Sequence, residues 1–542
     1  MITVNQGRAP SPRRVQTPSN KTPSAQSKTF APPIGGLVTN AQLALQRENT
    51  AVLAENFWPT KTGLEPRGGT QLRCTTAGAV EALFEYNAGS TPEFFAADSG
   101  NIYDWSESTV SGTSLTPVVT GQSGADYSTL VKQTDAGVYL TVVNGQDDLQ
   151  IYDGASWQAV TDVSSPFSIT GVDTDVLTHV WAYRNRTFFI EAGTMNAWYL
   201  GVNSVAGAAT KLPLSGVFNK GGVLLFGATW SSDSGSGMDD RCVFATDQGE
   251  FAVYSGGNPG DANDWSLNGV YNIGRPLGKN AHIQVGGDLI VATKAGLIPM
   301  SAAVQKDQSQ LKLSALSQAI DPDWRRETVL SGEASGWDLV KWDSRNMAVV
   351  APPLLTTSVG FCWPANLETG AWTKFTGWNV SALAVLNDRL YYGNGDGTIY
   401  LCDVGGLDDE QAFECRVCFA FDHLGAPGAY KTAHAIKGTW SYTQPFNAKH
   451  TIASDYNPAF GTAPSAATGA STSGAQWDVA LWDVTYWGSQ DSSYAIREKW
   501  ESVSGHGEVL APQIQVTSAQ DYKLDCELIA VDLLYSTGGV LT

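Results

Sequence analysis

The chain has few charged residues, and its first 47 residues contain no acidic residue at all. Only 16% of the 542 residues are charged. The acid-free segment contains the basic residues Arg8, Arg13, Arg14, Lys21, Lys28 and Arg47, and the remainder carries 27 basic and 53 acidic residues. Because cationic side chains supply most of the affinity for a phosphate backbone, this acidic body argues against tight binding of nucleic acid. It is compatible with a channel through which DNA slides, since attraction to phosphate would act as friction.

Cysteine and histidine are too scattered to suggest a disulfide framework or a metal site. The seven cysteines are odd in number and widely spaced, which is typical of reduced, buried thiols. Cys415 and Cys418 form a CxxC pair, but no second pair follows at metal spacing, and both lie in a strand-like run over 413–421. The six histidines are isolated. We therefore predict no metal, no cofactor and no catalytic residue.

Long apolar runs are also missing. No run of about eighteen apolar residues occurs, so no membrane-spanning segment is expected. The early arginines are not followed by an apolar stretch, so we predict no secretion signal. Synthesis and assembly in a cytoplasm are the expectation.

What the chain does contain is a recurring phrase: a short apolar strand, a tight Gly/Asn/Asp turn, and a second strand that ends in an aromatic residue. The first copy spans 94–105 and the last spans 390–400, with further copies near 142–153, 243–254 and 289–298. Units of roughly forty residues with three or four short strands are typical of β-propeller blades. The pattern predicts an all-β fold with about six blades. An array of β-sandwiches fits the same hairpins, because one hairpin does not show whether a ring closes.

Changes in composition divide the chain into three parts. Residues 1–35 are rich in Pro, Ser, Thr and Gln and predict an extended basic arm. Residues 36–405 predict the β-propeller-like domain, with a short helix-like stretch near 42–54 and a helical insertion near 306–336. Residues 406–542 predict an additional β-rich C-terminal domain, either separate or completed as a platform by the N-terminal forty residues. The Ala/Ser/Thr/Gly-rich stretch 462–475 predicts a loop.

The arm is the candidate partner-binding segment. A basic segment without a core of its own becomes ordered by lying on another surface, and a neighbouring chain is the natural support. The residues predicted to bind a partner are Arg8, Arg13, Arg14, Lys21 and Lys28.

Three groups of residues invite a chemical interpretation. Asp233, Asp239 and Asp240 could supply the paired carboxylates of a glycosidase, but their Ser/Gly-rich surroundings favour a loop. The run Asn394–Gly397 resembles a calcium loop, yet it lacks the acidic ligand series and favours a hairpin turn. The tryptophans suggest a sugar platform, but their recurrence late in each unit favours packing between blades; examples are Trp105, Trp157, Trp198, Trp265 and Trp372.

Several phrases of the chain resemble a known family of virion proteins. They are Val80–Asn87, Leu149–Gly154, Gly171–Thr174, Arg184–Arg186, Ala197–Leu200, Gly221–Gly222, Ser234–Gly237, Glu250–Gly256, Tyr271–Gly278 and Gly286–Val291. Together they resemble the tail nozzle (tail tube) proteins of short-tailed bacteriophages, over roughly 35–305. None of these phrases is catalytic, and 406–542 shows no such likeness.

The resemblance implies a structural protein of the virion tail, with no enzymatic activity. It implies a homo-hexameric ring beneath a head-to-tail adaptor protein, around a channel through which DNA passes without specific binding. Tail fibres or spikes and a tail needle are the further implied partners. The sequence does not identify the residues that line the channel. A β-propeller that binds or degrades polysaccharide is the alternative, and a connector of a long-tailed phage is a third reading.

Overall fold

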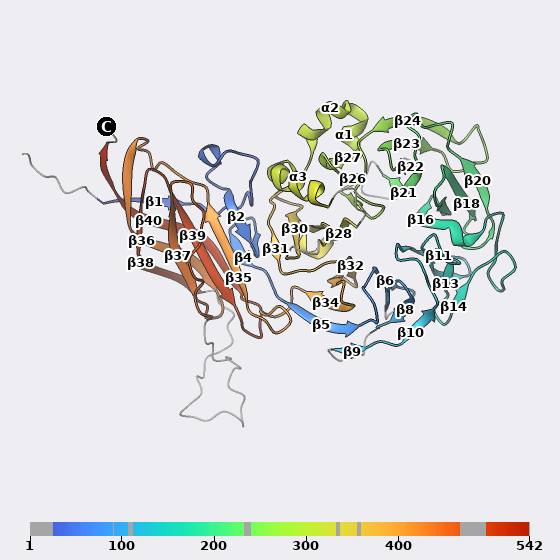
Figure 1. Ribbon diagram of the computed structural model, residues 1–542, viewed down its shortest axis with the longest axis horizontal. Coiled ribbons are helices and arrows are strands. Elements are labelled where there is room, and N and C mark those ends of the chain that lie inside the picture. Colours follow the sequence, from blue (N-terminus) through green and yellow to red (C-terminus); the bar gives the residue numbers. More distant parts are fainter. Residues whose placement is uncertain are drawn as a thin grey trace, which may run out of the picture.

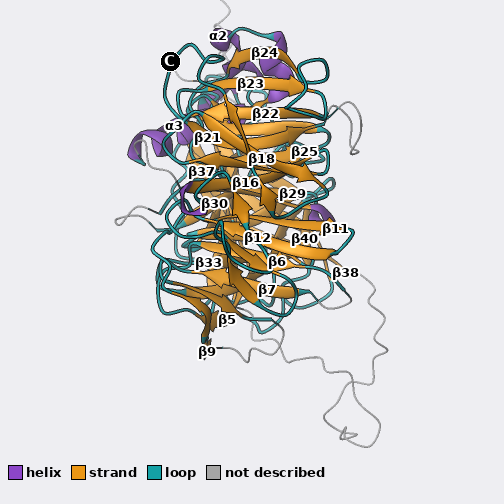
Figure 2. Ribbon diagram, turned by 90° about the vertical axis from the view of Figure 1, so that its right-hand side faces the viewer, coloured by secondary structure: helices purple, strands orange, loops and turns teal. Residues whose placement is uncertain are grey.

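The structure is a computed structural model that describes residues 25–89, 92–106, 112–231, 240–331, 336–354, 359–466 and 495–540. A β-propeller and a second, smaller β-domain lie side by side (Figure 1). Strands fill both parts, and helices lie only at the margin (Figure 2). The all-β propeller fold predicted from the sequence is confirmed.

The described strands of the propeller form seven sheets around a ring, one more than predicted. Blade 1 contains β6 (Ala82–Tyr86), β7 (Glu93–Ala97), β8 (Asn101–Asp104) and β10 (Pro117–Thr120). Blade 2 contains β11 (Ser128–Thr134), β12 (Gly137–Val143), β13 (Gln150–Tyr152) and β14 (Trp157–Ala159). Blade 3 contains β16 (Leu177–Tyr183), β17 (Arg186–Glu191), β18 (Asn196–Val202) and β20 (Thr210–Pro213), next to the small pair β15 (Ile169–Thr170) and β19 (Gly207–Ala208).

The second half of the ring follows the same order. Blade 4 contains β21 (Leu224–Trp230), β22 (Arg241–Thr246), β23 (Glu250–Ser255) and β24 (Ser266–Asn272). Blade 5 contains only β25 (His282–Val285), β26 (Asp288–Thr293) and β27 (Gly296–Pro299). Blade 6 contains β28 (Asp338–Trp342), β29 (Met347–Ala351), β30 (Phe361–Asn366) and β31 (Phe375–Thr376). Blade 7 contains β32 (Ala382–Leu386), β33 (Arg389–Gly393), β34 (Thr398–Cys402), β5 (Thr70–Thr75) and the short β9 (Thr113–Ser114).

Tight turns of matching chemistry connect the two inner strands of several blades. Arg184 and Asn185 join β16 to β17 with φ values of 42° and 60°, and Asn387 and Asp388 join β32 to β33 with 46° and 58°. Two successive residues with positive φ match the right-handed twist of a hairpin, and Asn and Asp tolerate them. The Gly/Asn/Asp turns of the recurring phrase are therefore hairpin tips.

The ring is closed by a strand from the N-terminal side of the chain. β5 precedes blade 1 in sequence but pairs antiparallel with β34 of blade 7, with Thr75 opposite Thr398 and Thr70 opposite Cys402. The last blade is thus built from both ends of the propeller segment. This closure ties blade 1 to blade 7 by backbone hydrogen bonds.

The helical insertion covers the open edge of blade 5. It contains α1 (Met300–Gln305), α2 (Gln308–Leu311), α3 (Asp321–Leu330) and the 3-10 turns η3 (Lys312–Ser314) and η4 (Gln318–Ile320). Trp324 of α3 donates a hydrogen bond of 2.9 Å to the carbonyl oxygen of Thr293 and is fully buried. The helices therefore protect the edge strand β27, which has no fourth strand beside it. Two further 3-10 turns are η2 (Thr174–Val176) and η5 (Asp343–Arg345).

The second domain consists of two sheets around one core. One sheet has the order β3 (Phe57–Pro59), β4 (Leu64–Pro66), β40 (Cys526–Val540), β36 (Ala429–Tyr442) and β38 (Ala495–Gly507), with β1 (Gln26–Phe30) also paired to β40. The other has the order β2 (Ala51–Glu55), β35 (Phe413–Phe419), β39 (Leu510–Ser518) and β37 (Ala448–Ser454). Side chains of both sheets share one buried cluster with blades 5 and 6, so the two domains have a common core.

The predicted domain boundaries need correction at the N-terminal side. Residues 26–66 belong to the second domain and not to an arm over 1–35 or a propeller that begins at 36. The reason is that β1, β2 and β4 pair with strands from beyond residue 405, and β3 pairs with β4. The stretch 42–54 contains only the 3-10 turn η1 (Leu43–Leu45) and part of β2, not a helix. The propeller proper spans β5 to β34. Of the two arrangements considered for the C-terminal region, the structure has the platform, in which strands from both ends of the chain build one domain.

Candidate functional site: the central cavity of the propeller

The innermost strands of the seven blades surround a cavity of about 460 Å³. It is lined from every blade, by residues of β6, β11, β16, β21, β25, β28 and β32 or directly before them. Cavities of a few hundred Å³ are the usual size of small-molecule sites. The central cavity is therefore the candidate site. Its ionisable and amide side chains are Glu81, Tyr127, His179, Asn280, His282, Gln284 and Asp338.

His179 of β16 is held at both ring nitrogens. Its Nε2 lies 2.9 Å from the carbonyl oxygen of Gly227 on β21, and its Nδ1 lies 3.1 Å from the hydroxyl oxygen of Ser128 on β11. Nε2 therefore donates to the carbonyl, and Nδ1 accepts from the hydroxyl. Burial, together with the charges of nearby His282 and Lys279, lowers the pKa of His179 to about 3. The ring is thus neutral at neutral pH and connects blades 2, 3 and 4.

His179 and Ser128 resemble the base and nucleophile of a hydrolase, but the geometry does not support that chemistry. The second nitrogen of His179 bonds a carbonyl oxygen and not a carboxylate that would stabilise an imidazolium. A pKa of about 3 makes the ring a weak base near pH 7. The pair therefore serves to join blades.

His282 of β25 lies close to His179, with ring centroids 6.2 Å apart. Its ring stacks on Phe226, with a centroid distance of 4.2 Å and an interplanar angle of 4°. Its Nδ1 lies 2.9 Å from the carbonyl oxygen of Lys279, so Nδ1 carries the proton and Nε2 is left as an acceptor. Burial lowers the pKa of His282 to about 4.

Lys279 directly precedes Asn280 of the cavity lining, and it is already paired. Its side chain is 4% exposed, and its Nζ lies 3.1 Å from Oδ1 of Asp126 and 2.9 Å from the carbonyl oxygen of Thr178. It also donates to the carbonyl oxygen of Asp126. Lys279 thus ties the segment before β25 to blades 2 and 3. Burial lowers its pKa, against the effect of Asp126.

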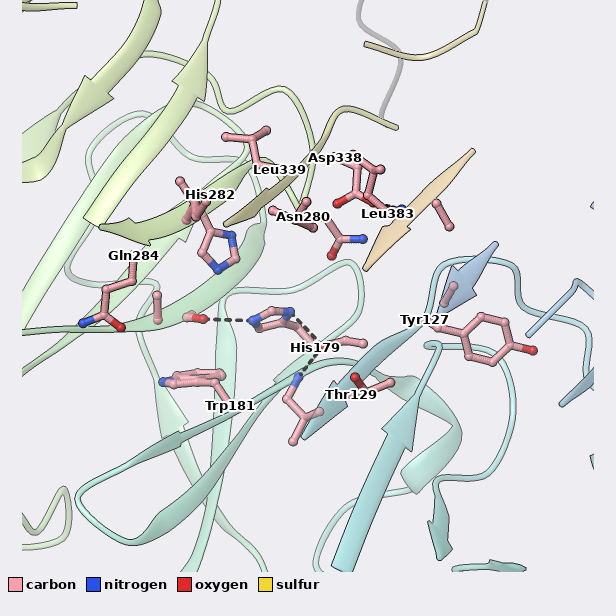
Figure 3. A pocket seen from close by; sticks show the side chains of 18 of the residues that line it. Tyr127, Thr129, His179, Trp181, Asn280, His282, Gln284, Asp338, Leu339 and Leu383 are labelled. Atoms are coloured by element: carbon pink, nitrogen blue, oxygen red, sulfur yellow. Dashed lines mark hydrogen bonds between the residues drawn. The ribbon is translucent and has the colours of Figure 1, made fainter. Parts of the chain in front are cut away.

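Two carboxyl groups of the cavity have no cationic partner among the residues that line it. Asp338 accepts a hydrogen bond of 2.7 Å from the backbone N–H of Leu383, yet burial raises the pKa of Asp338 to about 6. Burial and the charges of Asp126 and Asp98 raise the pKa of Glu81. None of the described lining residues is Lys or Arg. Figure 3 shows Asp338, Asn280 and His282 along one side of the cavity, with His179 facing them.

A second feature joins the propeller to the other domain. Arg67 lies between β4 and β5, its side chain is 2% exposed, and it donates to both carboxylate oxygens of Asp408 at 2.8 Å and 2.5 Å. Its remaining hydrogen bonds reach Asn56 of the second domain and the carbonyl oxygens of Gly68 and Thr376, the latter on blade 6. Its guanidinium also lies 4.0 Å from the ring centroid of Phe413. The segments by which the chain enters and leaves the propeller are therefore held together by the ion pair and hydrogen bonds of Arg67.

The arm residues predicted to bind a partner are only partly described. Arg8, Arg13, Arg14 and Lys21 lie outside the described residues. Lys28 lies on β1 and forms ion pairs with Glu48 and Asp422 of the same chain. Partner binding by Lys28 stays a prediction; within the chain, its charge is paired with two carboxylates.

The other sequence candidates that the structure describes lie in structural positions. Asp240 is 6% exposed directly before β22, while Asp233 and Asp239 lie outside the described residues. Asn394 accepts hydrogen bonds from the backbone of Asp396 and Thr398, as in a hairpin turn. Cys415 and Cys418 are both buried but belong to different core clusters.

The tryptophans singled out from the sequence pack against other side chains. Trp157 lies 5.0 Å from Phe95 and Trp265 lies 5.1 Å from Tyr254, measured between ring centroids. Trp105, Trp198 and Trp372 are at most 9% exposed. These rings support packing of blades and not a sugar platform.

Sequence reasoning missed the cavity residues. His179, His282 and Asp338 lie on different blades, and each occurs alone in the sequence. The available signal was their position: His282 and Asp338 begin the inner strands β25 and β28, and His179 lies within β16. The sequence would have predicted that these residues share one cavity only if the position of each inner strand had been known in advance.

Comparisons with known proteins add little beyond the fold. No family model and no curated protein matches the chain. Among solved structures, the chain is similar to BBS1N in its crystal structure with ARL6DN, with 10% identity, a TM-score of 0.37, and coverage of 62% of this chain and 97% of that chain. It is also similar to Sqt1 of Saccharomyces cerevisiae, with 11% identity, a TM-score of 0.33, and coverage of 61% and 98%. Likenesses this weak carry no conclusion about function.

Two features of the described residues bear on the type of site. Within these ranges, no three His, Cys, Asp or Glu side chains gather as they would around a metal ion. No helix among them is long and apolar enough to cross a membrane.

Proposed function

We propose that this chain is a structural protein of a virion, the tail nozzle of a short-tailed bacteriophage. In this proposal it forms a homo-hexameric ring below the head-to-tail adaptor, near the tail fibres or spikes and the tail needle. DNA passes through the ring without specific binding during ejection. The chain has no enzymatic role, and the tail of the virion is its location.

The observation that carries the proposal is where the family-like phrases lie in the fold. Leu149–Gly154 contains β13, Glu250–Gly256 contains β23, and Gly286–Val291 contains the β25–β26 turn and most of β26. Arg184–Arg186 includes the hairpin tip between β16 and β17. The likeness thus concerns the strands and turns that build the blades, which fits a family whose function is architectural. Two of the phrases also contribute Glu81 and Leu289 to the lining of the central cavity.

The mechanical part of the proposal rests on the junction of the two domains. The two domains share a buried core and are joined by the bidentate Arg67–Asp408 ion pair, so we expect them to move as one rigid unit. A subunit that bears internal pressure needs this property. The excess of acidic residues after residue 47 limits adhesion of DNA by repulsion of phosphate.

The basic arm is proposed to dock on a neighbouring chain, most simply the adaptor. Arg8, Arg13, Arg14 and Lys21 provide the charge, while Lys28 forms ion pairs with two carboxylates of its own domain. The proposal is tested by imaging the purified protein. Six-fold rings with a central hole support it, and a monomer under all assembly conditions contradicts it.

The alternative is a β-propeller that binds or degrades polysaccharide, and the polar central cavity of about 460 Å³ is the feature that favours it. A glycan-degradation assay with wild type and with Glu81→Gln and Asp338→Asn, which alter the carboxyl groups of the cavity, separates the two functions. Polysaccharide cleavage that is lost in these variants would replace the nozzle proposal.

A further inference from the structure

Acceptor atoms and carboxyl groups of the central cavity point to a ligand. The Nε2 atom of His282 is an acceptor, because Nδ1 donates to the carbonyl of Lys279. The carboxyl groups of Glu81 and Asp338 add further acceptors from blades 1 and 6. The proton of the Thr229 hydroxyl is not available to a ligand, because it is donated to the carbonyl oxygen of Ala182 at 2.7 Å. The cavity therefore presents acceptors on blades 1, 5 and 6, beside the amide side chains of Asn280 and Gln284, which can donate and accept.

The lining of the cavity also carries a net negative charge. Around the cavity, blades 1 and 6 contribute Glu81 and Asp338, while blades 2, 3, 4 and 7 contribute no charged lining residue. Lys279, before blade 5, is neutralised by Asp126. His179 and His282 are uncharged near pH 7. Two carboxylates are thus left without a cation in a concave, partly desolvated site.

We propose that the central cavity binds an organic cation, an alkylammonium or guanidinium group, between Glu81 and Asp338. Such a group donates several hydrogen bonds and carries the charge that the cavity lacks. A divalent metal fits less well, since the described residues contain no cluster of three metal-ligating side chains. The inference concerns the propeller alone and stands whether or not the chain forms a ring.

Two sources supply this chemistry: a free organic amine, or a basic side chain of an acid-free segment such as 8–14, with Arg8, Arg13 and Arg14. Burial also raises the pKa of both carboxyl groups, Asp338 to about 6. Cation binding requires their ionised forms, so affinity must fall as the pH drops from 7.5 towards 5.

The test is isothermal titration calorimetry of the full chain at pH 7.5 and low salt. One set of titrations uses agmatine, which carries both a guanidinium and an ammonium group. The other uses a synthetic peptide of residues 8–14 and the same peptide with citrulline in place of its arginines. The variants are Glu81→Gln and Asp338→Asn, which keep shape and hydrogen bonding. Asp135→Asn, in the exposed β11–β12 turn outside the cavity, is the matched control.

We expect saturable binding by wild type and by the Asp135→Asn control, and about tenfold weaker binding by each cavity variant, the size of one lost charge-assisted contact. Agmatine binding alone identifies a free cation as the ligand. Peptide binding that citrulline abolishes identifies a basic segment. Absence of binding of both ligands up to about 10 mM, or binding that neither cavity variant weakens, overturns the inference. Thermal unfolding of each variant checks that the fold is intact.

Discussion

Arg67 and Asp408 hold the two connections between the domains together through a bidentate ion pair, with N–O distances of 2.8 Å and 2.5 Å. Arg67 precedes the strand that closes the propeller, and Asp408 follows the last strand of blade 7. The pair therefore fixes the point where the chain enters the propeller to the point where it leaves. Its burial makes it a strong candidate for mutation.

Replacing Arg67 with Met should destabilise the protein by about 3–5 kcal/mol, because the carboxylate of Asp408, only 19% exposed, would lose its cationic partner. Urea unfolding measures this loss. Arg326→Met is the control, since Arg326 is 57% exposed and its ion pairs lie at the surface, where such pairs contribute about 0–1 kcal/mol. Equal effects of the two substitutions would refute the role given to the junction.

Gly69 allows the two connecting segments to touch. A Cβ atom at this position would lie 1.9 Å from the carbonyl oxygen of Leu407, whereas a Cβ at Gly216 would meet nothing within 4 Å. We expect Gly69→Ala to lower the melting temperature by several degrees or to prevent folding, since backbone on both sides must move. Gly216→Ala, the matched control, should leave it within about 2 °C. Similar melting temperatures for the two variants would show that the segments are not in contact.

The repeated hairpins and their turn residues were predictable because they depend on neighbours in sequence. Asn387 and Asp388 show this, since their identity alone favours the positive φ values observed. The pairing of β1 with β40 and of β5 with β34 joins residues hundreds of positions apart, and no local pattern encodes it. The domain boundary and the seventh blade were missed for this reason. The cavity was missed for the same reason, because His179, His282 and Asp338 come from three blades.

The two cavity histidines should make the protein sensitive to acid. Their pKa values in the folded protein, about 3 for His179 and about 4 for His282, lie below the usual 6.5. As the pH falls below 6.5, the unfolded chain binds protons that the folded protein does not, so stability decreases until the folded pKa values are reached. Asp338 opposes this between about pH 6 and its usual value of 3.8, because its folded pKa is raised.

Comparison with His282→Gln isolates one histidine from these opposing groups. The free energy of unfolding of wild type should fall more steeply between pH 6 and 4.5 than that of the variant, by up to about 1.4 kcal/mol per pH unit. Urea unfolding at several pH values gives both slopes. Parallel slopes would mean that His282 is not held neutral in the folded protein.

Removal of residues 2–25 should leave a folded protein, because this deletion stops before β1, which begins at Gln26. The deletion removes Arg8, Arg13, Arg14 and Lys21, and with them the proposed docking charge. We expect unchanged thermal unfolding but loss of incorporation into tails in a complementation assay. The control keeps residues 2–25 but has lysine in place of Arg8, Arg13 and Arg14, so that the positive charge of the arm is unchanged. Normal incorporation of the deletion variant would rule out docking by the arm.

The central claim is that this chain forms the wall of a channel as a ring of six copies. Cryo-electron microscopy of the purified protein, with its mass in solution, tests it most directly. The proposal predicts six-fold particles with an open centre and a mass six times that of the 57.7 kDa chain. Particles that stay monomeric, alone and with the adaptor, or rings of a different symmetry, would contradict it.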